Sequence, residues 1–79
     1  MTEFRAYEEF IDFIAAGPSS EHVATFQPSE GTRRRVLDLV AREKGEGLSP
    51  EESEELDHYI RLEHIMRLAK ARARRRLAP

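Results

Sequence analysis

The sequence contains no cysteine, which excludes disulfides and thiolate metal sites as sources of stability. A chain of 79 residues buries too little surface to have a wide stability margin, and small domains often add disulfides, metals or oligomerisation. Self-association or a bound partner is the remaining source of additional stability. No apolar run approaches the roughly 20 residues that span a bilayer, and the first residues lack a secretion signal. We therefore expect a cytoplasmic protein with no membrane contact.

The chain has four glycines and four prolines, and all but Gly31 lie at or outside the ends of the expected helices. Gly17-Pro18 ends a first helix, predicted over residues 3–16 with Thr2 as its cap. Ser29 is expected to cap a second helix over residues 30–44, which ends at Gly45. A short connector with a single helical turn, over residues 21–24, is predicted between them.

The strongest local signal is Ser49-Pro50-Glu51-Glu52, a capping box with proline at the first helical position. It predicts a third helix over residues 50–77, because no glycine or proline follows until Pro79. A helix of that length measures about 42 Å, so its C-terminal half is expected to extend beyond the other two helices or to pack on something else. No strand pattern is present, and we predict a single all-α domain over residues 1–79, with two shorter helices and the connector turn packed on a long C-terminal helix.

Apolar residues recur at helical spacing in all three helices. The first helix is predicted to bury Phe4, Tyr7, Ile11 and Ile14, widened by Phe10 and Phe13, and the second to bury Val36, Leu37 and Val40, with Leu39 beside them. In the third helix one stripe faces the core, formed by Leu56, Tyr59, Leu62, Met66, Ala69 and Ala73.

Ile60, Ile65 and Leu68 lie off that stripe, so the third helix is apolar nearly all round between residues 59 and 68. Such a helix is expected to be covered nearly all round, and a chain this short has little material for the purpose. We interpret this segment as a protein interface, with internal packing as the alternative. The predicted partner-binding residues are Ile60, Ile65, Met66, Leu68 and Arg72.

Charges are sorted along the third helix, although the net charge of the chain is only −2. Acidic residues occupy its start and basic residues its end, which complements the helix dipole. Six cations within ten residues exceed what the dipole requires. The clusters Arg33, Arg34, Arg35 and Arg74, Arg75, Arg76 are therefore candidate contacts for nucleic acid or an acidic partner, with solvated surface as the alternative for the first cluster.

Candidate chemistry is sparse. Glu55-x-x-His58 has the spacing of a bundle metal motif, but such a site needs further inward glutamates that the sequence does not offer. The serines sit where helix caps and turns explain them, and no glycine-rich phosphate loop follows a strand. We expect no enzyme activity, no metal, no cofactor and no small-molecule substrate.

Several runs resemble a known family: residues 10–18, 26–30, 48–52, 55–59 and 62–74. The sequence is similar to a family of short, mostly uncharacterised bacterial proteins, common in cyanobacteria. These look like the antitoxin-like small partner of two-gene toxin–antitoxin modules, beside an HNH-type nuclease. The resemblance implies an all-helical fold and a cognate protein of the toxin or nuclease kind as partner; it supplies no catalytic residues.

The combined hypothesis is a non-enzymatic protein-binding module that docks its long helix on a cognate protein. Two alternatives stay open: a small nucleic-acid-binding regulator that uses the basic clusters, and a structural homodimer.

Overall fold

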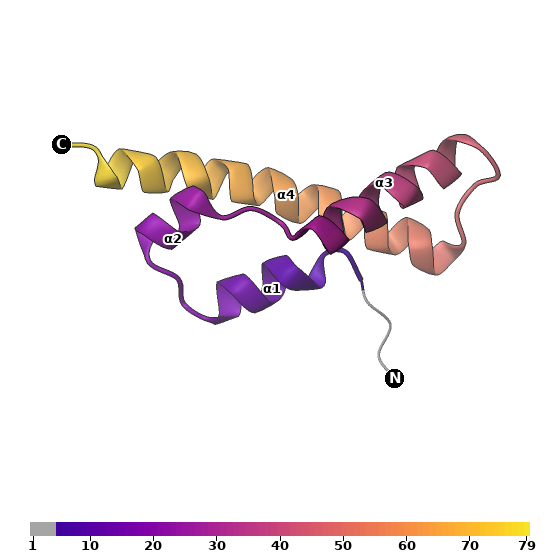
Figure 1. The fold of residues 1–79 in the computed structure, drawn as a ribbon, viewed down its shortest axis with the longest axis horizontal. Helices are drawn as coiled ribbons and strands as arrows, with labels where there is room; N and C mark the ends of the chain where they lie inside the picture. Colours follow the sequence, from indigo (N-terminus) through magenta and orange to yellow (C-terminus); the bar gives the residue numbers. More distant parts are fainter. Residues whose placement is uncertain (1–4) are drawn as a thin grey trace.

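The chain folds into four helices in a computed structural model that describes residues 5–79 (Figure 1). They are α1 (Glu8–Ala15), α2 (Ser20–Thr25), α3 (Glu30–Lys44) and α4 (Pro50–Leu77), and residues 5–79 contain no strand. The molecule is elongated, with principal extents of 49 × 28 × 19 Å. The predicted all-α class is therefore confirmed, with the connector turn present as α2. No helix within residues 5–79 combines the length and apolarity needed to cross a membrane.

Serine caps fix where three of the helices begin. The side chains of Ser19, Ser29 and Ser49 each accept a hydrogen bond from the backbone N–H three residues later. The capping box predicted at Ser49 is complete, because the Glu52 carboxylate also accepts from the Ser49 N–H at 3.1 Å. Gly47 then provides the positive φ of 94° in the turn before α4. The predicted bounds 30–44 and 50–77 are confirmed.

The first helix begins later than predicted, at Glu8 rather than Glu3. Thr2, Glu3 and Phe4 lie outside the described residues. Residues 5–8 form a turn instead, in which the Glu8 carboxylate accepts the Arg5 N–H at 3.1 Å. The Ala6 N–H donates a hydrogen bond to the Glu55 carboxylate of α4 at 2.8 Å, and so is not used within the N-terminal segment. A contact with a residue far away in the sequence therefore sets this boundary.

The core lies where α1 and the segment after α2 meet the middle of α4. Phe10 is buried at its centre with Ala6, Tyr59 and Met66. The Phe10 ring centroid is 5.2 Å from Tyr59 and 5.5 Å from Phe26, distances at which aromatic rings attract beyond their buried area. The core is therefore narrow and largely aromatic.

The predicted apolar faces of the two shorter helices are partly wrong. On α1 the buried side centres on Phe10, and Ile11 and Ile14 are exposed. On α3 the fully buried residues are Leu39 and Thr32, whereas Leu37 is exposed. On α3 the buried stripe lies at a different angle around the helix axis from the predicted stripe, because Thr32 and Leu39 are seven residues apart and so share one face.

The C-terminal half of α4 carries α2 along one side (Figure 1), so the connector packs on the long helix as predicted and this half does not extend free of the rest of the chain. Lys70 donates a hydrogen bond to the Phe26 carbonyl at 2.7 Å, and Ala73 is buried. Val23 and Ala69 line a groove of about 230 Å³ between the two helices. The connector therefore covers part of the long helix, and the opposite side stays open.

Candidate partner-binding surface

The side of α4 that faces away from the other helices carries large apolar residues. Ile60, Ile65 and Leu68 are 55%, 54% and 60% exposed. Successive helical residues are about 100° apart, so these three occupy the half of α4 opposite buried Tyr59 and Met66. We call the exposed positions of this half, from Glu54 to Arg75, the outward face. Ile60, Ile65 and Leu68 lie along its middle beside exposed Arg61 and His64, and its edge at Arg72 borders the groove between α4 and α2.

All four isoleucines of the chain are exposed, which is unusual because isoleucine is among the residues most often buried. Ile11 and Ile14 on α1 are each 48% exposed. Single exposed apolar residues are common, but a whole residue type left outside a core is not. Much of the apolar surface of this chain is therefore unused by its own fold.

Met66, predicted as a partner-binding residue, does not belong to the outward face. It is 4% exposed and packs in the core cluster with Phe10 and Tyr59. The reason is its place on the helix, since Met66 follows Tyr59 by seven residues and shares its face. Tyr59 and Met66 are therefore used for internal packing, whereas Ile65 and Leu68 stay available for a partner.

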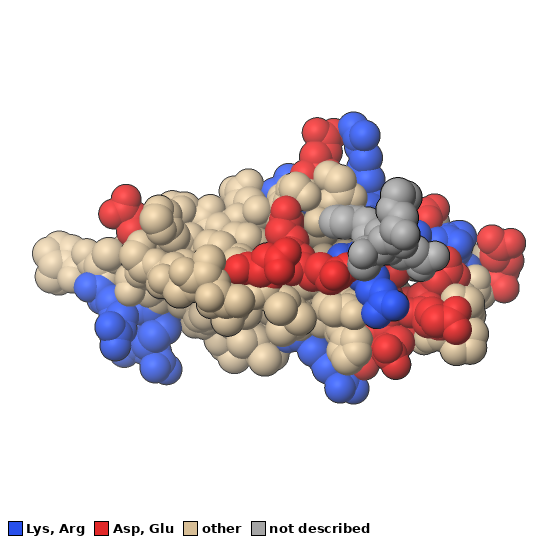
Figure 2. Space-filling model, turned by 90° about the horizontal axis from the view of Figure 1, so that it is seen from below, with Lys and Arg blue, Asp and Glu red and all other residues tan. Residues whose placement is uncertain are grey.

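Unpaired arginines crowd the end of α4. Arg72 and Arg74–Arg76 are exposed, and no acidic side chain within residues 5–79 lies within ion-pair distance of them. Figure 2 shows one group of Lys and Arg side chains at the end of the molecule that holds the C-terminal part of α4, while most Asp and Glu side chains lie toward the other half, where further Lys and Arg side chains lie among them. The acidic residues are therefore concentrated away from the end of α4, whereas basic residues occur in both halves.

The other predicted basic cluster, Arg33–Arg35, is dispersed. Arg33 donates to the Gln27 side chain at 3.1 Å, Arg34 pairs with Glu30 on the same helix, and Arg35 turns toward α4. Three consecutive helical positions point in three directions, as helix geometry requires. Arg35 must be removed from the candidate nucleic-acid contacts, because its charge is already neutralised inside the protein.

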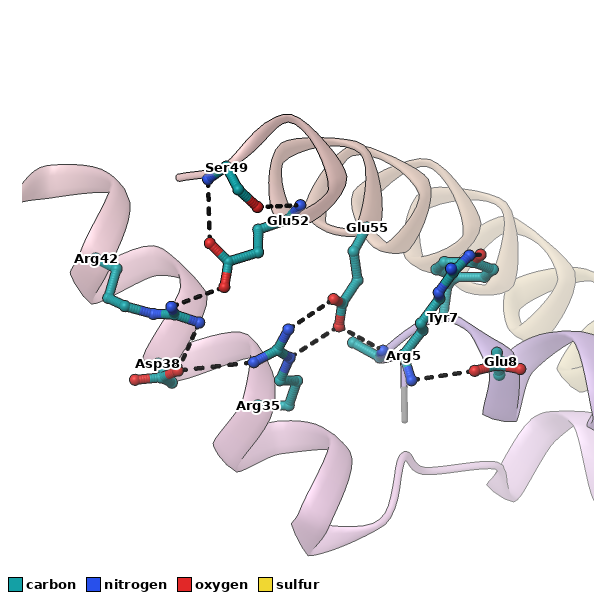
Figure 3. Close-up of polar contacts among 10 residues, drawn as sticks. Arg5, Tyr7, Glu8, Arg35, Asp38, Arg42, Ser49, Glu52 and Glu55 are labelled. Atoms are coloured by element: carbon teal, nitrogen blue, oxygen red, sulfur yellow. Dashed lines mark hydrogen bonds and ion pairs between the residues drawn. The ribbon is translucent and has the colours of Figure 1, made fainter. Parts of the chain in front are cut away.

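The partner of Arg35 is Glu55, a buried carboxylate that joins three parts of the fold (Figure 3). Arg35 donates from Nε and Nη2 to its two oxygens at 3.0 and 2.8 Å, and the Ala6 N–H donates at 2.8 Å. Burial by itself would raise the pKa of Glu55, but these hydrogen bonds and the Arg35 charge outweigh it, so the pKa is lowered. Ionised Glu55 therefore links the N-terminal segment, α3 and α4 through its hydrogen bonds, and we call these contacts the Glu55 tie.

The Glu55-x-x-His58 spacing does not build a metal site. The His58 ring packs edge-on against Tyr7 with the ring centroids 5.1 Å apart, and the Glu55 oxygens accept hydrogen bonds from Arg35 and the Ala6 N–H. No group of three or more potential metal ligands occurs in the described part of the chain.

The sequence reasoning missed this buried tie, although two signals were present. Glu55 precedes Tyr59 by four residues, which places a carboxylate on the buried side of α4. Arg35 precedes Leu39 by four residues and lies beside the buried side of α3 in the same way. A carboxylate and a guanidinium on facing apolar stripes are expected to pair, because unpaired buried charges are costly.

Comparison of the chain with protein-family models, with curated proteins and with solved structures gives no match.

Proposed function

We propose that this protein is a non-enzymatic, antitoxin-like binding module that docks the outward face of α4 on a cognate protein. The observation that supports this is the exposure of Ile60, Ile65 and Leu68 by more than half each, on a helix whose other side is occupied. Ile65, Leu68 and Arg72 stand at i, i+3 and i+7, the spacing with which a helix enters a groove.

The apolar residues of the outward face would make a modest contribution to the free energy of docking. Full burial of one such side chain contributes about 1.5–3 kcal/mol, and roughly half of that remains available at these exposures. Three side chains together offer about 3 kcal/mol, which corresponds to about a hundredfold in the dissociation constant. The unpaired arginines at the end of α4 would speed association with an acidic partner.

The resemblance to small partners of two-gene modules suggests which protein to test. Co-expression with the product of the adjoining gene should give a complex that co-purifies and restores growth if that product is toxic. The double variant Ile65→Ser/Leu68→Ser should weaken the complex by roughly thirtyfold while keeping its helicity. Ile11→Ser/Ile14→Ser, a similar change at exposed positions on α1, is the matched control and should bind normally. Equal binding by both double variants would exclude the outward face as the docking surface.

A second function is favoured by the unpaired arginines at the end of α4, namely nucleic-acid binding. It differs in its salt dependence. Phosphate contacts release counterions, so the logarithm of the binding constant should fall with the logarithm of salt concentration by about 0.9 per contact on a duplex. Apolar docking should be nearly independent of salt between about 50 and 200 mM. Arg35 takes no part in this alternative, because it is bound to Glu55.

A further inference from the structure

The outward face of α4 has a charge pattern that is symmetric about its own midpoint. Four pairs of positions lie at equal distances from a point between His64 and Ile65, and all eight are exposed. The pairs are Glu54 with Arg75, Asp57 with Arg72, Arg61 with Leu68, and His64 with Ile65. Acid at one end thus mirrors base at the other, with the apolar residues near the centre.

We infer that the free protein pairs with a second copy of itself, through the outward faces of two α4 helices in antiparallel orientation. In that register Glu54 of one protomer lies opposite Arg75 of its partner, and Asp57 opposite Arg72. A two-fold axis repeats each contact, so four complementary ion pairs flank the centre. A parallel pair would instead place Glu54 against Glu54 and Arg75 against Arg75, which is repulsive. Two-fold dimers of this isologous kind are the commonest oligomers.

The acids at the start of this face are free to make such contacts. The Glu54 and Asp57 side chains are 69% and 53% exposed, and among residues 5–79 each is paired with one residue, a turn away on the same helix. His58 lies 3.9 Å from Glu54, and Arg61 lies 3.1 Å from Asp57. A carboxylate has two oxygens and accepts a further donor, so Arg72 of the partner can bind Asp57 without breaking the local pair.

The centre of the face supplies the apolar part of the contact. Ile65 lies beside the axis and Leu68 lies opposite Arg61, whose aliphatic stem can cover an apolar side chain while its charge stays in water. From Glu54 to Arg75 the face is about 32 Å long. In Figure 1 the C-terminal half of α4 has α2 on one side and no other segment on the opposite side, so a second helix has access.

The same pattern argues against a nucleic acid as the occupant of this face, since Glu54 and Asp57 would repel phosphates at one end. The inference also does not require the proposed function: self-pairing can be measured without any cognate protein. If both hold, a cognate protein must displace the second copy from the same face.

Paired charge reversals test the inference by analytical ultracentrifugation. Wild type should change from monomer to dimer with rising concentration. Glu54→Arg/Asp57→Arg and Arg72→Glu/Arg75→Glu should each raise the dimer dissociation constant at least about tenfold, since attraction becomes repulsion. An equimolar mixture of the two variants should form a heterodimer. Lys44→Glu/Arg74→Glu changes the net charge equally, at exposed positions outside the face, and should dimerise like wild type.

Cysteine cross-linking tests the orientation, and the chain has no native cysteine to interfere. His64→Cys should oxidise to a disulfide-linked dimer, because it lies beside the axis. Arg75→Cys should not cross-link to itself but should cross-link to Glu54→Cys when the two proteins are mixed. Self-cross-linking of Arg75→Cys would overturn the antiparallel register. A wild type that stays monomeric at millimolar concentration, or a mixture that stays monomeric, would overturn self-pairing and leave the face to a different protein.

Discussion

Replacing Glu55 with glutamine should destabilise the fold more than any other single change of charge. Glutamine keeps the shape but loses the charge that Arg35 and the Ala6 N–H bind. Removing one partner of a buried ion pair costs about 3–5 kcal/mol, and an exposed pair contributes about 0–1 kcal/mol. The Glu55 side chain is 6% exposed but that of Arg35 is 29% exposed, so this pair falls between the two cases. We expect a loss of about 2–3 kcal/mol.

That loss is large for this chain. A domain of its length has a total unfolding free energy of about 4–12 kcal/mol. Each kcal/mol moves the melting temperature by about 4–8 °C at this size, so Glu55→Gln should lower it by about 10–20 °C. Circular dichroism at 222 nm, followed through urea and thermal unfolding at pH 7, measures both quantities.

Glu54→Gln is the matched control. It replaces the same carboxylate by the same amide one position earlier, at a side chain that is 69% exposed. It should alter the unfolding free energy by less than about 0.5 kcal/mol. If Glu55→Gln proves as stable as Glu54→Gln, then Glu55 does not tie the segments together and the reasoning is wrong.

The pH dependence gives an independent check of the same tie. The pKa of Glu55 is lowered in the folded protein from its ordinary 4.5, so ionised Glu55 stabilises the fold above that value. The stabilisation is lost as the pH falls through the lower, folded value. The difference between wild type and Glu55→Gln should therefore be constant from about pH 7 to 5 and shrink below about pH 4. A difference that stayed constant to pH 2.5 would contradict a charge-based tie.

Three further changes should be measured by urea unfolding. Met66→Ala should cost about 2–4 kcal/mol because it empties a buried site, whereas Leu68→Ala, two residues away and exposed, should cost under about 0.5 kcal/mol; similar costs would mean that the assigned buried side of α4 is wrong. Gly47→Ala should cost about 1–2 kcal/mol, since φ is 94° there, and no loss would show that the turn relaxes. Ser49→Ala should cost about 1 kcal/mol by removing a helix cap, and a neutral result would show that Pro50 alone positions the helix start.

Features that depend on a few neighbouring residues were predicted well from the sequence. The start of α3 at Glu30 and that of α4 at Pro50 follow from serine caps, and a cap acts within one turn. The connector turn and the stripe through Tyr59 and Met66 were also predicted, because helical spacing places those residues on one face.

Features that depend on distant residues were not predicted. The start of α1 was placed at Glu3, because the sequence does not show that the Ala6 N–H is taken by a carboxylate 49 positions away. Ile11 and Ile14 were expected in the core, but the aromatic ring of Phe10 fills the space against α4. The exposure of Ile60, Ile65 and Leu68 followed from their positions off the stripe, whereas what binds them is a proposal.

The contact between Ala6 and Glu55 also bears on the order in which the chain assembles. Arg35 and Glu55 are 20 positions apart and are brought together by the short turn between α3 and α4, whereas Ala6 and Glu55 are 49 positions apart. Closing the shorter loop first has the lower entropic cost, so the α3–α4 hairpin should form before the N-terminal segment joins it. The Ala6 amide lies outside any helix, yet it should exchange slowly with deuterium, and its exchange rate would report each detachment of the N-terminal segment from a persisting hairpin.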